Sequence, residues 1–247
     1  MQKTEQQKKE RVPSSRARFF VYIIESPSPN DLLNDRSEGK LLTKALELAL
    51  INSKYNLVVN ENTFSEALQI RLYQAMSNTE GTPILHFSSH GNKDGIGLTN
   101  GGFISWEKLK ELLIPVNKAL RGALVICMSS CEGFRGCRMA MTEGGDFPFF
   151  GLIGPKGTPV WSDTAVAFVT FYHLFFKGKS VVEAVKAMRI ASGENHFQEI
   201  LAADARQAWK EITKDQKQEV AAERLRRAIE NTGVSIPPDH SATGPSQ

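Results

Sequence analysis

Two hydrophobic segments of this chain end in side chains that could do chemistry. Residues 84–91 read ILHFSSHG and residues 124–133 read LVICMSSCEG, so each apolar run leads to His90 or to Cys131 and then to small residues. A histidine can take the proton of a thiol and later protonate a leaving amine. If the two segments are neighbouring parallel strands, about 4.8 Å apart, the imidazole and the thiol meet within one substrate group. This pattern favours a cysteine hydrolase site.

Gly91, which follows the histidine, fits the same chemistry. A residue without a Cβ atom lets a substrate backbone approach closely. The backbone N–H groups of Gly91 and Cys131 are therefore our candidates for an oxyanion hole, in which each donor contributes about 3 kcal/mol.

The order of these motifs resembles the catalytic core of caspase-like cysteine peptidases, and most closely that of the bacterial CHAT family. A strand ending in His-Gly precedes a strand ending in Ser-Cys-Glu-Gly, and the resemblance covers roughly residues 80–192. Its later matches are Gly154, Trp161, Asp163, Phe171, Tyr172 and residues 178–184, GKSVVEA. The resemblance implies a His90 and Cys131 dyad acting on protein or peptide substrates. It also implies control by a regulatory companion protein and a role in bacterial defence.

Two acidic residues are candidates for substrate binding. Asp163 follows an expected strand at residues 159–161, so it would emerge at the same sheet edge as the dyad and could select a basic substrate side chain. It could equally cap a helix that starts near Ala165. Glu132, directly after Cys131, is either a substrate contact or a solvated loop residue.

Metal binding is an alternative use of the same residues, because His86 and His90 share one strand face and could join Cys131 or Cys137. The chain has no paired C-x-x-C motif. His86 is more simply a buried histidine beneath the site, and Cys127 a small core residue. We therefore expect an enzyme without a metal or an organic cofactor.

Apolar runs and helical stripes alternate along the chain, which predicts an α/β fold. The resemblance makes this a caspase-like open, mostly parallel sheet with helices on both faces. Ligands bind at the carboxyl ends of the strands in such sheets. The expected strands are 19–24, 56–59, 84–89, 123–129, 149–154 and 159–161, with a hairpin at 95–104 and an irregular loop at 132–148. The expected helices are 42–50, 63–75, 105–113, 165–176, 180–188 and 203–230.

The chain of 247 residues predicts one principal domain over residues 18–200. A charged helical extension at 201–233 and disordered tails at 1–17 and 234–247 complete the expected organisation. Residues 1–18 hold six Lys or Arg against Glu5 and Glu10, so most of the formal charge of +3 is local. This excludes a nucleic-acid surface on the folded body.

Neither a signal peptide nor an apolar run of the ~18 residues that span a bilayer is visible, so we expect a cytoplasmic protein without a membrane partner. The three cysteines, at 127, 131 and 137, are odd in number and clustered, which favours reduced thiols.

Two alternatives to a peptidase remain. A catalytically silent interaction module would keep the same fold and lose only turnover. A non-proteolytic thiol hydrolase or acyltransferase would use the same pair on a small substrate.

Overall fold

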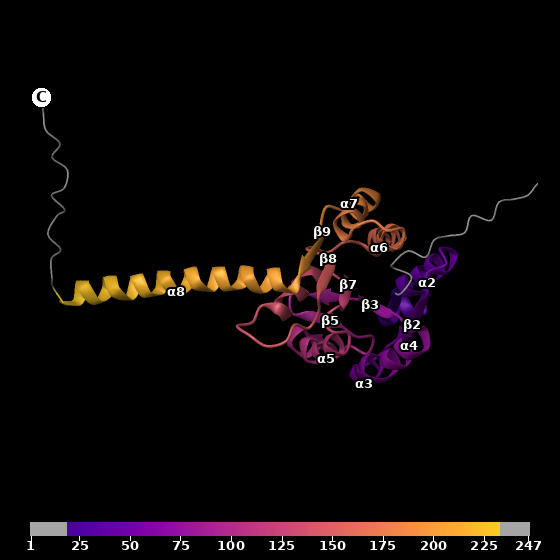
Figure 1. Ribbon diagram of the computed structural model, residues 1–247, viewed down its shortest axis with the longest axis horizontal. Coiled ribbons are helices and arrows are strands. Elements are labelled where there is room, and N and C mark those ends of the chain that lie inside the picture. The colour runs from indigo at the N-terminus through magenta and orange to yellow at the C-terminus, as the bar shows by residue number, and fades with distance from the viewer. Residues whose placement is uncertain (1–18, 233–247) are drawn as a thin grey trace, which may run out of the picture. The chain divides into compact units, whose positions relative to one another are not determined.

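A six-stranded sheet organises the chain in the computed structural model, which describes residues 19–232 (Figure 1). The strand order is β2-β1-β3-β7-β8-β9, in which the first five strands are parallel and β9 is antiparallel to β8. The strands are β1 (Phe19–Ser26), β2 (Ser53–Leu57), β3 (Thr82–Ser89), β7 (Val125–Ser129), β8 (Gly151–Pro155) and β9 (Phe197–Leu201). The predicted α/β class and mostly parallel sheet are confirmed.

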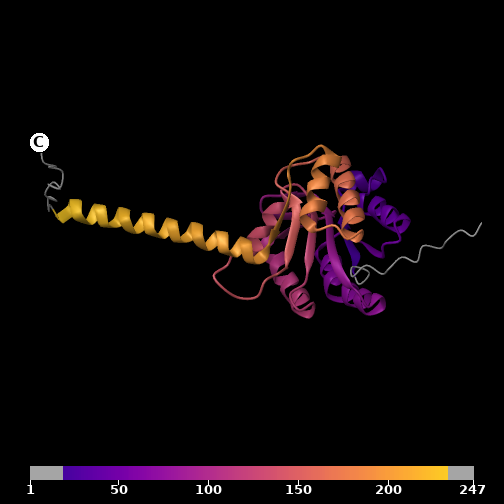
Figure 2. The ribbon, with the colours of Figure 1, turned by 45° about the horizontal axis from the view of Figure 1, so that its top comes forward.

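Helices cover both faces of the sheet (Figure 2). One face packs against α2 (Glu38–Leu48), α6 (Trp161–Phe176) and α7 (Val181–Ser192). The other face packs against α3 (Glu61–Glu66), the π-helical turn η2 (Ala67–Arg71), α4 (Leu72–Thr79), α5 (Trp106–Ala119), the 3-10 helix η3 (Gly133–Ala140) and the start of α8 (Ala202–Thr232). This arrangement explains why the central strands are apolar on both sides.

Strand β1 shows how the sequence serves two cores. Phe20 and Tyr22 lie in the core beside α3 and α4, whereas Val21 and Ile23 lie in the core beside α6. Successive side chains of a strand point to opposite faces, so a continuous apolar run buries both. The run ends at Glu25, a charged residue that is fully buried.

A second, small sheet lies beyond β3. It joins β4 (Gly91–Asn92), β5 (Gly95–Gly97) and β6 (Phe103–Ser105) in antiparallel order, which is close to the expected hairpin. Ser105 then caps α5, as the sequence predicted, by accepting a hydrogen bond from the N–H of Lys108.

Three local expectations are wrong, and one strand was not expected. Residues 159–161 form no strand, because α6 begins at Trp161. The helix expected from Thr63 begins at Glu61, because Asn60 and not Thr63 is its N-cap. The stretch 132–148 is not wholly irregular, since η3 lies within it. Strand β9 was not expected, because its burial pattern is mixed and its sequence FQEIL carries a charge.

The chain divides after Arg206 into two units. The first contains the large sheet, and Ala202 and Ala205 at the start of α8 are buried in its core, so the expected boundary at residue 200 lies inside it. The described part of the second is the polar remainder of α8, a single helix. The expected tails, 1–17 and 234–247, lie outside the described residues. No helix between residues 19 and 232 is long and apolar enough to cross a membrane.

The core position of Cys127 generates a test. Its side chain is fully buried in the α6 core, and burial raises the pKa of its thiol to about 12. We expect Cys127→Ala to lower the free energy of unfolding, measured by urea denaturation, by about 1 kcal/mol through a small cavity. Alkylation of Cys131 should proceed at the wild-type rate. If a folded Cys127→Ala protein lost this reactivity, the chemical role would belong to Cys127 and not to Cys131.

Candidate active site

The two predicted reactive side chains follow directly paired strands. Strand β3 runs parallel to β7, and the last rung of their ladder pairs Ser88 with Ser129. His90 and Cys131 each lie two residues beyond that rung, so they leave the sheet at equivalent positions on the same edge. The expected adjacency of the two segments is confirmed.

Gly91 packs directly against the backbone that carries Cys131. A Cβ atom placed on Gly91 would lie 2.8 Å from the carbonyl oxygen of Cys131 and 2.9 Å from the Cβ of Ser130. Both contacts are closer than real Cβ atoms tolerate, and they involve backbone and a short, buried side chain. The absence of a side chain at this position therefore brings the two strand tips together.

The pairing of β4 with β5 orients the N–H of Gly91. The N–H of Gly97 donates to the carbonyl of His90 at 2.8 Å, so His90 and Gly97 form a hydrogen-bonded pair of this ladder. The pair Gly91–Ile96 comes next along the ladder. In an antiparallel ladder, hydrogen-bonded and non-hydrogen-bonded pairs alternate. The N–H of Gly91 therefore points away from β5, as an oxyanion donor must.

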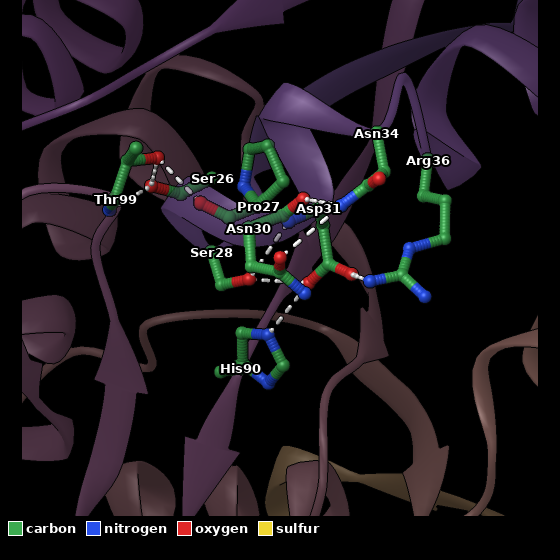
Figure 3. A network of polar contacts seen from close by, with 9 residues as sticks. All are labelled: Ser26, Pro27, Ser28, Asn30, Asp31, Asn34, Arg36, His90 and Thr99. Carbon is green, nitrogen blue, oxygen red and sulfur yellow. Dashed lines mark hydrogen bonds and ion pairs between the residues drawn. The ribbon is translucent and has the colours of Figure 1, made fainter.

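His90 has a carboxylate partner that the sequence did not predict. Its Nε2 lies 3.2 Å from Oδ2 of Asp31 (Figure 3). An ionised Asp31 accepts the Nε2 hydrogen, which leaves Nδ1 as the basic nitrogen of the ring. The contact thus sets both the tautomer and the orientation of the imidazole.

Asp31 is itself held in place by its neighbours. It lies in the short helix α1 (Pro29–Leu33), whose N-cap Ser28 donates a hydrogen bond to Oδ2 of Asp31, while Arg36 pairs with Oδ1 at 3.0 Å. The pKa of Asp31 is held below its usual value, first by the hydrogen bond from Ser28 and then by the hydrogen bond from His90 and the positive charge of Arg36. Ser-Pro before an acidic residue is a helix-start signal, and it follows the carboxyl end of the first strand, so the sequence did carry a clue.

Trp161 also contacts His90. The centroids of the two rings are 5.5 Å apart and their planes are inclined by 60°. The imidazole is therefore packed by an aromatic ring from the start of α6 and bonded to a carboxylate from α1 (Pro29–Leu33), while half of its side chain is exposed. A substrate can reach it.

The Cys131 thiol is half-buried and neutral at rest. Burial, and then the charge of Glu132, raise the pKa of Cys131, while its own backbone N–H opposes the shift. Glu132 adopts a left-handed conformation with φ of 58°, and its carboxylate accepts a hydrogen bond from Nε of Arg135 at 2.7 Å. The chain thus turns sharply after Cys131, and the expected ligand Glu132 is engaged by Arg135.

Asp163 occupies neither position that the sequence predicted. It lies in the first turn of α6, after the N-cap Val160, so it is neither a strand end nor the cap. A carboxylate in a first turn stabilises a helix through its dipole. Trp161 in the same turn contacts His90, but residues two apart on a helix do not share a face, so this contact does not extend to Asp163.

A cavity of about 430 Å³ opens beside His90. Its walls are residues 26–29 and 97–101, which carry neutral side chains, and Asp163 does not line it. Thr99 donates a hydrogen bond to the carbonyl of Pro27 at 2.7 Å, so the two walls are joined.

The metal alternative does not match the position of His86. This side chain is fully buried, its Nδ1 lies 2.9 Å from the hydroxyl of Tyr172, and burial lowers its pKa to about 3. It therefore remains neutral beneath the site, as the sequence suggested. Within residues 19–232, no group of three or more His, Cys, Asp or Glu side chains is placed to hold a metal ion.

A buried carboxylate lies under the two strand tips. Glu38 accepts a hydrogen bond from Ser88 and another from Ser129, each at 2.6 Å. Burial, which outweighs these hydrogen bonds, and the neighbouring charge of Glu25 raise the pKa of Glu38 to about 7.

Comparison with known proteins adds little to this geometry. No family model matches the sequence, and no curated protein matches it. Among solved structures, the chain is similar to the complex of Porphyromonas gingivalis RgpB pro- and mature domains, with 10% sequence identity and a TM-score of 0.44. The match covers 72% of this chain and 44% of that one, so the chain spans less than half of its length.

The raised pKa of Glu38 predicts how stability varies with pH. The folded state holds a proton on Glu38 up to about pH 7, whereas the unfolded chain releases it near 4.5. Stability should therefore fall as pH rises through this window, by an amount on the order of 3 kcal/mol.

Glu38→Gln cannot ionise, so it should exceed the wild type in free energy of unfolding at about pH 8, and the difference should vanish near pH 4.5. Urea denaturation at several pH values measures this. Glu47→Gln, on the exposed side of α2, is the matched control. An equal difference at all pH values would contradict the assigned protonation.

Proposed function

We propose that this protein is a caspase-like cysteine endopeptidase of the CHAT type. The observation that carries the proposal is the placement of His90 and Cys131 beyond one rung of the β3–β7 ladder, with Asp31 bonded to Nε2 of the imidazole. A thiol, a base and a carboxylate that orients the base are the parts that activated nucleophiles need.

The reaction begins with a proton transfer. The raised pKa of Cys131 means that the resting thiol keeps its proton, so Nδ1 of His90 must accept it when substrate is bound. Asp31 stabilises the imidazolium that forms. The sulfur then attacks the peptide carbonyl carbon, and a tetrahedral intermediate with one negative oxygen results.

Backbone donors and the imidazolium complete the cycle. The N–H groups of Gly91 and Cys131 stabilise the oxyanion. His90 returns its proton to the leaving amine as the C–N bond breaks, which leaves a thioester on Cys131. Water, deprotonated by His90, hydrolyses the thioester and restores the thiol.

The protein's setting is part of the proposal. A protein or peptide is the substrate, and the CHAT resemblance of residues 80–192 suggests a regulatory companion protein, a cytoplasmic site of action and a role in bacterial defence. The proposed peptidase domain, expected at residues 18–200, extends to about Arg206, where the compact unit ends, and the rest of the helical extension expected at 201–233 is a candidate surface for such a companion.

Replacement of either dyad member tests the proposal. Cys131→Ala and His90→Ala should each abolish cleavage of a denatured protein library, because the two residues act as a unit. Thermal unfolding should stay close to that of the wild type, since neither side chain is in a core. Cys137→Ala is the matched thiol control and should cleave normally.

Three other results would overturn the proposal. Normal turnover by a purified dyad variant would exclude the dyad. A wild-type protein that an electrophilic peptide labels at Cys131, but that cleaves no protein, would be a non-proteolytic thiol hydrolase or acyltransferase. One that resists labelling would be a silent interaction module.

Substrate preference separates the roles of the two aspartates. If Asp163 contacts the substrate, basic residues should dominate before the cut bond, and Asp163→Asn should erase this preference. Asp31→Asn should instead lower kcat at least about tenfold with the preference unchanged, because it disturbs only the imidazole. Proteome-wide profiling of cleavage sites measures both. Acidic or small apolar residues before the cut would exclude Asp163 as the selecting group.

A further inference from the structure

Polar side chains form a row across the buried sheet just below the candidate dyad. Glu25 of β1 is in register with Ser88 of β3, which is in register with Ser129 of β7. All three are almost fully buried, and so is Glu38, the first residue of α2. A buried row of this kind requires an explanation, because the rungs below it on the same face are mainly apolar.

One carboxylate joins the two strands that carry the dyad. Oε2 of Glu38 accepts from the hydroxyl of Ser88, and Oε1 accepts from the hydroxyl of Ser129, both at 2.6 Å. These serines form the last rung of the β3–β7 ladder. Any change in the separation of the two strand ends must therefore stretch a short hydrogen bond to Glu38.

The helix start that carries Glu38 is fixed on both sides. Glu25 accepts hydrogen bonds from the hydroxyl of Ser37 and from the N–H of Gly39 at 2.9 Å, and Tyr55 donates to it at 2.7 Å. The residues before and after Glu38 are thus attached to β1. Gly39 is itself required, because a Cβ atom there would lie 2.8 Å from the ring of Tyr55.

Stability alone does not account for this arrangement. A buried carboxylate without a cation costs several kcal/mol, and well-packed apolar residues usually serve a core better. No Lys or Arg among residues 19–232 forms an ion pair with Glu38. Departures from the rules of core packing concentrate at functional sites.

We propose that Glu38 is a positioning residue, which holds the ends of β3 and β7 at the separation that brings His90 and Cys131 together. This proposal rests on the peptidase function proposed above. Glu38 touches neither substrate nor dyad, and acts only through Ser88 and Ser129.

The protonation state of Glu38 determines how well it holds both serines. An ionised carboxylate accepts from both hydroxyls, and such charge-assisted bonds are the stronger ones. A protonated Glu38 donates its O–H to one serine and accepts from the other, so one bond reverses its direction and both lose the assistance of the charge. The groups that face Glu38 are the carboxylate of Glu25 from β1, the hydroxyls of Ser88 from β3 and Ser129 from β7, and those of Thr164 and Tyr172 from α6.

The site should therefore weaken as the pH falls through about 7, where Glu38 gains its proton. The effect on the reaction is opposite in sign to the effect on stability. Protonation favours the folded state, whereas the ionised form favours the aligned dyad.

The test compares the wild type with Glu38→Gln, which mimics the protonated side chain at every pH. The first readout is the rate of alkylation of Cys131 by iodoacetamide between about pH 5 and 9, followed on the Cys131 peptide by mass spectrometry. The second is kcat and KM on a cleaved peptide. Glu47→Gln on the same helix is the matched control.

We expect the wild type to show a step in both rates near pH 7 that Glu38→Gln lacks. At about pH 8 the variant should remain about three- to tenfold below the wild type in kcat with KM unchanged. Glu47→Gln should keep the step. A Glu38→Gln protein with the wild-type profile, whatever its thermal stability, would overturn the positioning role.

The two proposals fail separately. A wild-type protein that cleaves no protein overturns the peptidase function, while the alkylation profile still decides on Glu38. If Glu38→Gln does not fold, Ser88→Ala with Ser129→Ala removes both donors and leaves the carboxylate. That variant should also lose the step, and retention of the step would contradict the proposal.

Discussion

The parallel pairing of β3 with β7 is the constraint on which the candidate site depends. Parallel strands deliver their carboxyl ends to one edge of a sheet, and the register of Ser88 with Ser129 gives His90 and Cys131 equivalent positions there. A shift of one residue would turn one of the two side chains to the opposite face. Gly91 secures the same register from outside the ladder, since only a residue without a side chain fits against Cys131.

The remainder of the site comes from segments that approach this edge from other layers. Asp31 arrives from α1 (Pro29–Leu33) and Trp161 from the start of α6, and both contact His90. Glu38 arrives from α2 below them. Each of these residues lies at or near the beginning of a helix, close to the carboxyl end of a strand, which is where open α/β sheets place their ligand sites.

The sequence predicted the central strands well, because long apolar runs that are buried on both faces have few alternative structures. It also predicted the adjacency of the two strands that lead to His90 and Cys131, since both strands are such runs. Asp31 and Glu38 were missed because their partners lie far along the chain, and no local pattern records those contacts. Asp163 was misplaced because Pro159, Val160 and Trp161 look like a short strand, whereas the helix that follows extends back to Trp161.

The long sequence separation of these contacts also bears on folding. Asp31 and His90 are 59 residues apart, and Glu38 and Ser129 are 91 residues apart. Closing loops of this length costs conformational entropy, which the contacts offset only once they have formed. Such contacts are therefore expected late in folding. A partly folded chain therefore carries Cys131 as an ordinary thiol, without its histidine or the carboxylates below it. Under the proposed function, reactivity therefore belongs to the completed fold, and an unfinished chain cleaves neither itself nor its neighbours.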